Sequence, residues 1–201
     1  MKIGIFGGAF NPVHNGHLHL IDTLCDTPLA PDNTPVERML IIPTADPPHR
    51  TGADFAPGED RIRMLRLALT NPKAEICDIE FRLPGKSYTF NTVTALRELY
   101  PEDSFYLFMG TDQLLHFNEW YRCEELAQMA QIVAFPREDG DMPRIAQFIA
   151  ENPSLHAAAV TAVPYEMSST RIRAAVKNGE DIRRIVPPAV ANYVKEHRLY
   201  E

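Results

Sequence analysis

The chain has few cysteines, and none are spaced like a metal site or a disulfide framework. Cys25, Cys77 and Cys123 are its only three. Small secreted scaffolds use more cysteines at closer spacing, and a zinc site would need a closely spaced pair. The start of the chain also lacks the pattern of a signal peptide. We therefore expect free thiols and a cytoplasmic location.

Long apolar runs and an excess of positive charge are also missing. No stretch of the 201 residues is apolar enough for a membrane span, and the net charge is −7, from 20 Lys and Arg against 27 Asp and Glu. A broad nucleic-acid surface needs a basic face, so we expect no nucleic acid and no membrane among the partners. A small anionic ligand, held by a few aimed donors, stays compatible, as does a homo-oligomer.

Short apolar segments alternate with amphipathic ones along the whole chain. Strands are predicted at 2–6, 36–42, 75–81, 104–110, 132–135 and 159–163, and helices at 17–25, 60–71, 89–99, 119–129, 144–150, 168–179 and 188–197. This alternation is typical of an α/β fold, a Rossmann-like doubly wound parallel sheet with helices on both faces. We expect one domain over 1–201, with the C-terminal helices (about 168–201) packed against the sheet. Ligands of such sheets bind beyond the carboxyl ends of the strands.

The loop after the first strand reads "GGAFNPVHNGH" at 7–17. Gly7 and Gly8 let backbone N–H groups approach a ligand without a Cβ in the way. The helix that follows offers free N–H groups and a positive dipole end, which suit phosphate. His14 and His17 are three residues apart and face one side of this helix start, where phosphate would raise the pKa of an imidazole. The loop is therefore a candidate phosphate site.

Three competing interpretations of such motifs carry less weight. The dinucleotide fingerprint Gly-x-Gly-x-x-Gly is absent from the loop. His14, His17 and His19 form no His-Glu-x-x-His motif and have no obvious fourth metal ligand. The "GKS" at 85–87 resembles a P-loop, but the glycine that this motif needs five residues earlier is Glu80.

Polar or glycine residues follow two later strands. Tyr88 and Thr89 lie at the start of the helix predicted at 89–99, whose free N–H groups suit a carboxylate. An ordinary helix cap by Ser87 or Thr89 explains the pattern equally well. Gly110 permits close approach of a ligand. Asp112 is placed to accept from a ribose or to order a metal ion through water, with a helix cap as the alternative. Trp120, the only tryptophan, is either a core residue or a stacking platform.

A second helix start near the C-terminus repeats the phosphate chemistry. The segment "SSTRIR" at 168–173 places hydroxyl and N–H groups together, and Arg173 follows one turn later, where its guanidinium can fork onto phosphate oxygens. Arg171 points elsewhere on the helix and is expected to be solvated. Together with the first loop, Ser169, Thr170 and Arg173 would enclose a triphosphate from two sides.

These motifs together resemble a known family. "GGAFNPVHNGH" is similar to the His-x-Gly-His signature of the nucleotidylyltransferase superfamily, whose members attack the α-phosphate of a nucleoside triphosphate and release pyrophosphate. "DPPHR", "SYTFNT", "MGTDQLLHFNEWYRCEEL", "MSSTRIR" and "VPPAVANYVKEHRLY" resemble further motifs of the nicotinate-nucleotide adenylyltransferases. The resemblance extends over nearly the whole chain, and it implies adenylyl transfer from ATP to nicotinate mononucleotide with Mg²⁺ as the accompanying ion.

The resemblance also implies a role for each candidate residue. The catalytic residues are His14, His17 and Arg173. The mononucleotide would be held by a second set: His49 and Arg50 near its phosphate, Tyr88 and Thr89 at the nicotinate carboxylate, and Trp120 stacked on the pyridine. ATP would be bound by the residues Gly7, Gly8, Phe10, His14, His17, Gly110, Asp112, Ser169, Thr170 and Arg173. No residue is expected to bind metal directly, and Asp112 is the candidate for contact through water.

The sequence departs from the family pattern in three places. Arg50 replaces a lysine, which keeps the charge but changes the geometry, and Asn91 replaces an aspartate. The loop at 26–35 is longer than usual. Three other functions stay open: transfer to nicotinamide mononucleotide, phosphopantetheine or a polyol phosphate (by adenylyl or cytidylyl transfer), a non-catalytic nucleotide sensor, and a metal-dependent hydrolase.

Overall fold

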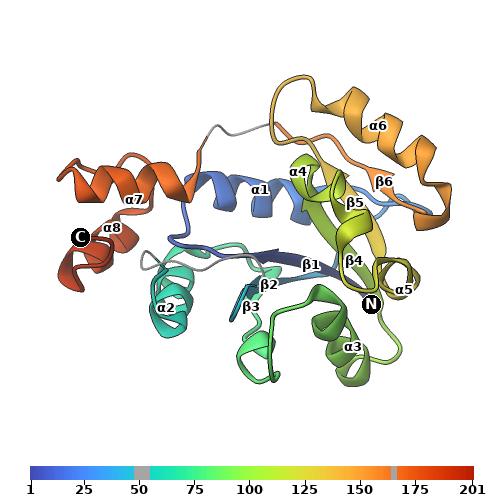
Figure 1. Ribbon diagram of the computed structural model, residues 1–201, viewed down its shortest axis with the longest axis horizontal. Coiled ribbons are helices and arrows are strands. Elements are labelled where there is room, and N and C mark those ends of the chain that lie inside the picture. Colours follow the sequence, from blue (N-terminus) through green and yellow to red (C-terminus); the bar gives the residue numbers. More distant parts are fainter. Residues whose placement is uncertain (48–54, 164–166) are drawn as a thin grey trace.

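A parallel sheet forms the centre of the molecule (Figure 1). The structure, a computed structural model, describes residues 1–47, 55–163 and 167–201. Within these residues the sheet has six strands in the order β3-β2-β1-β4-β5-β6, and every neighbouring pair is parallel. The strands are β1 (Lys2–Gly8), β2 (Arg38–Pro43), β3 (Ala74–Ile76), β4 (Ser104–Gly110), β5 (Gln131–Phe135) and β6 (Ala158–Ala159). The predicted α/β doubly wound sheet is confirmed.

Two hydrophobic clusters cover the two faces of the sheet. Successive residues of β1 point to opposite faces, so that Ile3 and Ile5 join one cluster and Phe6 joins the other. Burial on both faces explains the nearly continuous apolar runs of the strands. The helices are α1 (Asn15–Asp26), α2 (Gly58–Ala68), α3 (Thr89–Leu99), α4 (Thr111–Leu114), α5 (Cys123–Met129), α6 (Asp141–Glu151), α7 (Ser169–Lys177) and α8 (Pro188–Glu196).

The chain changes direction across the sheet between β1 and β4. Strands β2 and β3 extend to one side of this pair, and β5 and β6 extend to the other. The apolar sides of α1 and α2 belong to the cluster with Phe6, and those of α3, α5 and α6 belong to the cluster with Ile3. The loops that follow β1 and β4 therefore diverge at the carboxyl edge, where sheets of this kind have their ligand-binding crevice.

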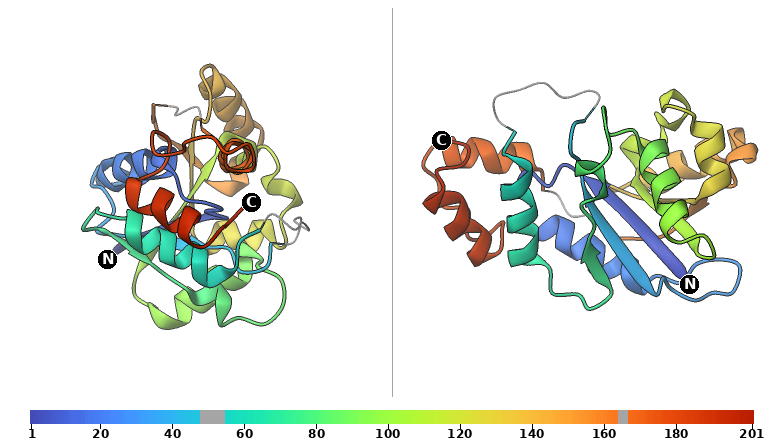
Figure 2. Two further views of the ribbon diagram at one scale, coloured as in Figure 1. Left: turned by 90° about the vertical axis from the view of Figure 1, so that its left-hand side faces the viewer. Right: turned by 90° about the horizontal axis from the view of Figure 1, so that it is seen from below.

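The C-terminal helices lie beyond this carboxyl edge, at the opposite end of the molecule from the N-terminus (Figures 1 and 2). Helix α8 packs against α2. Ile172 of α7 and Val190 of α8 are fully buried in the same cluster as Phe6, so these helices share one core with the α1 face of the sheet. No helix among the described residues is long and apolar enough to cross a bilayer.

Several predicted elements differ from the observed ones, and the last strand, expected at 159–163, is only Ala158–Ala159. The third strand, expected at 75–81, ends at Ile76, and a 3₁₀ turn (Ile79–Phe81) follows because its backbone bonds close locally, with Phe81 N–H donating to the Asp78 carbonyl. The helix expected at 119–129 begins only at Cys123, because Arg122 before it has the left-handed φ of 54°. The short helix α4 was not predicted.

Candidate functional site

The first loop leaves the sheet at the end of β1 with open space beside its glycines. A Cβ on Gly7 would meet no atom within 4 Å among the described residues, so this side of the loop is accessible to a ligand. A Cβ on Gly8 would lie 3.2 Å from the Phe10 ring, and Phe10 itself is buried with a left-handed φ of 45°. A side chain at position 8 would therefore crowd the Phe10 ring, and one at position 7 would occupy the open side of the loop.

His14 and His17 form a reciprocal cap at the start of α1. The Nδ1 atom of His14 accepts from the His17 N–H, and Nδ1 of His17 accepts from the His14 N–H, both at 3.3 Å. The two rings stack with centroids 3.6 Å apart. Because each Nδ1 is an acceptor, each neutral ring carries its proton on Nε2. The cap thus gives two imidazoles with N–H donors of fixed tautomer.

Burial keeps both of these rings neutral. It lowers the pKa of His14 to about 4, with the Arg137 guanidinium as a second cause. The pKa of His17 is well below its ordinary value, through burial, the His14 ring and Arg137. The raised pKa expected from the sequence is therefore not a property of the protein alone, and bound phosphate would have to supply it. At neutral pH the two uncharged imidazoles therefore offer N–H donors but no positive charge to the site.

The start of α7 lies against the first loop, as the sequence analysis expects. The Ser169 hydroxyl donates to the Pro12 carbonyl at 3.0 Å, and Arg173 Nη1 donates to the Asn11 carbonyl at 2.9 Å. Arg173 Nη2 also donates to the Thr170 hydroxyl at 3.2 Å. The residues joined by the Ser169 and Arg173 bonds are 157 and 162 positions apart in sequence. Two distant segments of the chain thus meet at one site.

Arg137 is a candidate site residue that the sequence analysis missed. It follows the carboxyl end of β5 and lines a small cleft together with His14 and His17. A Cβ on Gly110 would lie 2.7 Å from Arg137 Cγ and Cδ and 2.8 Å from Asp112 Oδ1, so the missing side chain of Gly110 makes room for the arginine as well. The signal was available, because basic residues just after a parallel strand meet at this edge.

The start of α3 is bonded to the segment that follows β2, through the Ser87 N–H and the Asp46 carbonyl. Tyr88 is its N-cap residue and makes no side-chain cap within the described residues, while the Ser87 hydroxyl accepts from the Asp46 N–H at 3.0 Å. The alternative explanation of this segment, a cap by Ser87 or Thr89, is therefore wrong. The first N–H groups of α3, which include that of Thr89, lack a side-chain acceptor there and suit a carboxylate.

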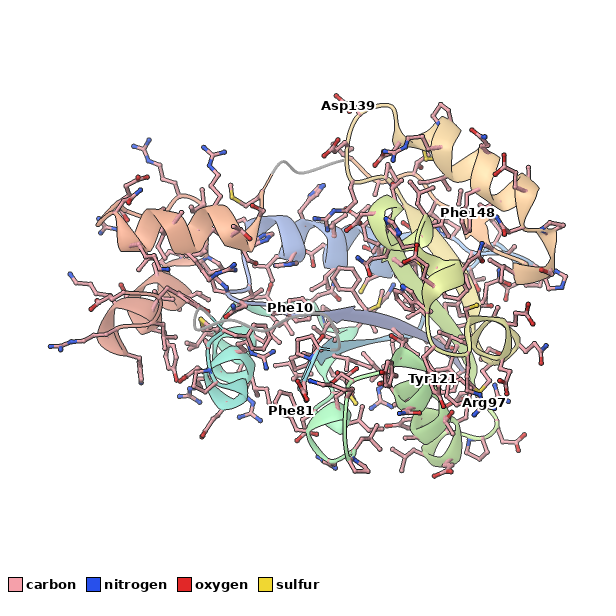
Figure 3. The ribbon with its side chains drawn as sticks, in the orientation of Figure 1. Phe10, Phe81, Arg97, Tyr121, Asp139 and Phe148 are labelled. Atoms are coloured by element: carbon pink, nitrogen blue, oxygen red, sulfur yellow. The ribbon has the colours of Figure 1, made fainter. Side chains whose placement is uncertain are left out.

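Exposed aromatic rings surround this helix start. Tyr88, which is 36% exposed, lies 4.9 Å from the ring of Tyr121, which is 50% exposed and was not predicted. Trp120 is half-buried, with its ring 5.4 Å from that of the buried Phe117. Figure 3 labels Tyr121 on the side of the sheet that α3 covers. Trp120 thus has one side in the core and part of its surface exposed to solvent.

Several predicted residues have no structural test. His49 and Arg50 lie outside the described residues. Asn91 lies in the first turn of α3, where its N–H donates to the Tyr88 carbonyl, and nothing in the structure explains the replacement of aspartate. Among the described residues no three His, Cys, Asp or Glu side chains converge on a metal.

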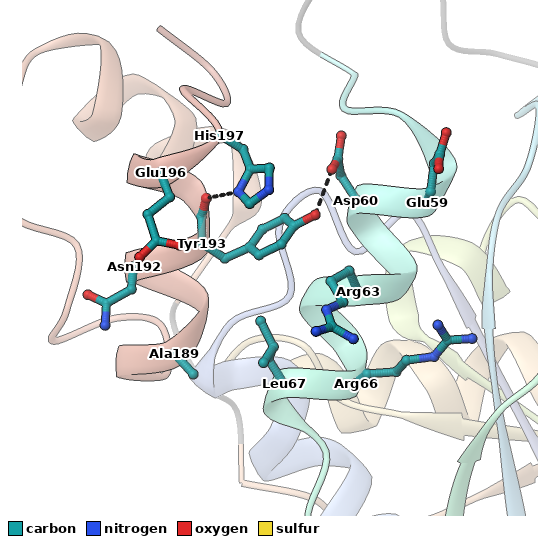
Figure 4. A pocket seen from close by; sticks show the side chains of 10 residues that line it. All are labelled: Glu59, Asp60, Arg63, Arg66, Leu67, Ala189, Asn192, Tyr193, Glu196 and His197. Carbon is teal, nitrogen blue, oxygen red and sulfur yellow. Dashed lines mark hydrogen bonds between the residues drawn. The ribbon is translucent and has the colours of Figure 1, made fainter.

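A separate cavity lies between α2 and α8 (Figure 4). Its volume is about 630 Å³, and it contains none of the predicted site residues. Its walls mix both signs of charge, and Tyr193 crosses it to donate to Asp60 at 2.8 Å. Acidic groups beside the basic ones, such as Glu59 near Arg63, make it a poor site for a triphosphate. The chemistry of the residues, and not cavity size, therefore places the candidate site at the carboxyl edge.

Comparisons with known proteins agree with this geometry. A model of the cytidylyltransferase-like family matches residues 5–175. A relative from Synechococcus sp. (strain JA-3-3Ab), named probable nicotinate-nucleotide adenylyltransferase, is 38% identical over 201 residues, covering 99% of this chain and 94% of the relative. The chain belongs to the nicotinate-nucleotide adenylyltransferase family.

A second relative supports this assignment, and a solved structure supports the fold. A relative of the same name from Geobacter sulfurreducens is 35% identical over 218 residues, with 100% of this chain and 98% of the relative covered. The structure of Plasmodium falciparum nicotinic acid mononucleotide adenylyltransferase complexed with NaAD has a TM-score of 0.81 at 17% identity, covering 99% of this chain and 97% of that one. At that identity the likeness confirms the fold.

Proposed function

We propose that this protein transfers the adenylyl group of ATP to nicotinate mononucleotide and releases pyrophosphate. The products are nicotinate adenine dinucleotide and diphosphate, and the reaction belongs to NAD biosynthesis. The observation that carries this function is the meeting of the His14–His17 cap with the start of α7 at the carboxyl edge of the sheet. The membership of the chain in the family selects the two substrates.

ATP would bind where the first loop, α7 and the end of β4 meet. His14 and His17 would donate from Nε2 to the phosphates, and Ser169, Thr170 and Arg173 would hold the triphosphate from the other side. The backbone around Gly7, Gly8 and Phe10 would approach the nucleotide closely. Gly110 and Asp112 would lie near the ribose.

Nicotinate mononucleotide would bind on the α3 side of the crevice. The backbone of Tyr88 and Thr89 would donate to the nicotinate carboxylate, and Trp120 would stack on the pyridine ring. His49 and Arg50 would contact the phosphate of the mononucleotide. The uncapped first turn of α3 supports this arrangement, because it supplies donors and a positive dipole end for an anion.

The reaction would proceed by in-line attack. The phosphate oxygen of the mononucleotide attacks the α-phosphorus of ATP, a bond forms between them, and the bond from the α-phosphorus to the bridging oxygen breaks. This phosphate is already ionised near neutral pH, so no general base is needed. Rate enhancement would come from placement and from the imidazole and guanidinium donors aimed at developing charge. Mg²⁺, bound by the phosphates and through water by Asp112, would neutralise the leaving pyrophosphate.

The direct test is a panel of acceptors. Pyrophosphate release is followed with ATP and nicotinate mononucleotide, nicotinamide mononucleotide or phosphopantetheine. We expect the highest kcat/KM for the acid, because the donors of the α3 start match a carboxylate. Equal values for acid and amide would contradict the assignment of Tyr88 and Thr89. No pyrophosphate with any acceptor, despite ATP binding, would favour a nucleotide sensor.

The three cysteines, all free, support the proposed cytoplasmic location.

A further inference from the structure

The turn at Asn11 in the first loop is held by three other segments of the chain. The side chain of Asn11 is 1% exposed, and its Oδ1 accepts from the Tyr200 hydroxyl at 2.8 Å and from the Ala56 N–H at 3.0 Å. Its backbone carbonyl accepts from Arg173. Asn11 precedes His14 by three residues, so these bonds fix the backbone from which the imidazoles project.

A buried arginine lies beneath the same loop. Arg61, in the first turn and a half of α2, is 1% exposed and is the largest fully buried side chain among the described residues. Its Nη1 donates to the Ala9 carbonyl at 2.9 Å, and its Nε donates to the Ala56 carbonyl at 3.0 Å. The Phe55 ring centroid lies 4.3 Å from Cζ. Arg61 thus bonds both the loop and the residue that bonds Asn11.

The charge of Arg61 is not matched by a bonded carboxylate. No ion pair involves it within the described residues, and its hydrogen bonds run to neutral carbonyls. Burial lowers its pKa to about 10, which leaves the guanidinium protonated at neutral pH. Glu80 acts on it only through space, and a buried cation without a bonded counter-ion is costly unless something else balances it. A polyphosphate on the other side of the loop is an anion of the right sign to do so.

The peptide between Ala9 and Phe10 shows how this network acts on a ligand. The carbonyl of Ala9 points to Arg61, and in a trans peptide the following N–H points the opposite way. The Phe10 N–H is therefore directed away from Arg61. Rotation of this peptide would break the Arg61 bond, so the arginine determines the direction of a donor in the loop.

We propose that Arg61 and Tyr200 are positioning residues for the nucleotide: they hold the Ala9–Asn11 backbone in its phosphate-binding conformation, and Arg61 adds a buried positive charge beneath it. This inference rests on the proposed function, since it concerns the triphosphate half of that site. Neither residue needs to touch the substrate. Tyr200 acts through Asn11, and Arg61 acts through Ala9 and Ala56.

The test compares two tyrosine variants by calorimetric binding of a non-hydrolysable ATP analogue and by steady-state kinetics. Tyr200→Phe removes the hydroxyl that bonds Asn11. Tyr193→Phe is the matched control, because it removes a hydroxyl that bonds Asp60 at the same distance of 2.8 Å in the groove between α2 and α8. We expect Tyr200→Phe to weaken analogue binding and kcat/KM for ATP by roughly three- to tenfold, the value of one hydrogen bond.

The control and the acceptor separate positioning from a structural role. Tyr193→Phe should leave analogue binding within twofold of wild type, and Tyr200→Phe should leave KM for the mononucleotide unchanged. Equal analogue affinity for Tyr200→Phe and wild type would overturn the proposal, as would equal losses in both variants. Because the binding assay needs no acceptor, a wild-type protein that binds the analogue without adenylating nicotinate mononucleotide would refute the function and still test the network.

Two arginine variants separate charge from geometry. Arg61→Lys keeps the positive charge but loses the planar guanidinium that bonds two carbonyls at once. Arg61→Met removes both the charge and these bonds, with a side chain of similar volume. We expect roughly tenfold weaker analogue binding for the lysine variant and a hundredfold for the methionine variant. Equal binding in a folded Arg61→Met protein would overturn the role of Arg61. If that variant does not fold, the lysine variant decides the question. Wild-type affinity for the analogue in Arg61→Lys would refute the positioning role of the guanidinium.

Discussion

The two halves of the candidate site are built in different ways. On the triphosphate half, the loop after β1 is tied by side-chain bonds from α2, α7 and the C-terminus, and His14 is buried. On the mononucleotide half, the start of α3 carries exposed rings, with Tyr88 36% and Tyr121 50% exposed. The first half is held by hydrogen bonds between distant segments, and the second is open and aromatic.

This difference matches the demands of the two substrates. The α-phosphorus is where bonds change, so the donors around it contribute most when they are fixed before the substrate arrives. The pyridine ring undergoes no chemistry and needs only to be recognised, for which stacking surfaces and a helix start suffice. Changes on the triphosphate half should therefore lower kcat, and changes on the mononucleotide half should raise KM.

The largest effect is expected from His17→Ala, which removes a fixed donor from the triphosphate half. Turnover should fall by ~10²–10³, the usual loss for one transition-state donor. Steady-state rates of the folded variant measure this, with His19→Ala on the same helix as control. Near wild-type turnover for His17→Ala would show that the triphosphate half does not control kcat in the way proposed.

The buried histidines also predict how stability depends on pH. The pKa of His14 is about 4 in the folded protein against an ordinary 6.5, and that of His17 is lowered too. The unfolded chain therefore binds protons that the folded one does not, and stability should fall as pH falls from about 6.5 toward 4. Each histidine contributes up to about 1.4 kcal/mol per pH unit.

Urea unfolding at several pH values measures this slope. His14→Gln cannot titrate and should give a shallower slope over the same window. Carboxylates such as Asp32 and Asp181, whose pKa values are lowered to about 2, lose their stabilising effect only as pH falls below about 4. An unchanged slope in His14→Gln would mean that this ring is not held neutral by burial.

Trp120→Ala tests the mononucleotide half. Loss of one stacking surface, worth roughly 1–3 kcal/mol, should raise KM for nicotinate mononucleotide about tenfold or more and leave KM for ATP nearly unchanged. Initial rates with each substrate varied in turn provide the measurement. A fall in melting temperature with both KM values unchanged would show that Trp120 is only a core residue and would remove the main support for the open half.

The smallest effect is expected from Arg137→Ala at the edge of the triphosphate half. Its guanidinium lowers the pKa of both histidines, so its removal should raise both values. Because Arg137 is exposed, KM for ATP should rise only severalfold. NMR titration of the imidazoles follows the pKa change, and Arg144→Ala on α6 is a control of equal charge. Unchanged histidine pKa values would place Arg137 outside the site.

Much of the fold could be predicted from local patterns. The helix at Thr89–Leu99 and the strand at Ser104–Gly110 have the bounds that their periodicity predicts. Elements whose ends depend on a single backbone angle, such as α5 behind Arg122, were predicted less well, because no apolar pattern marks a left-handed residue. The pairing of the first loop with α7 was predicted because both helix starts carry groups that suit phosphate.

By itself, the sequence determined the alternating sheet, the glycine loop with its two histidines, and the family to which the chain belongs. These depend on local spacing and residue type. Only the tertiary structure decided that the two imidazoles cap each other, that burial lowers their pKa, and that Arg61, Arg137 and Tyr200 meet at the loop. Those features depend on contacts between distant segments, and a contact leaves no periodic trace in the sequence.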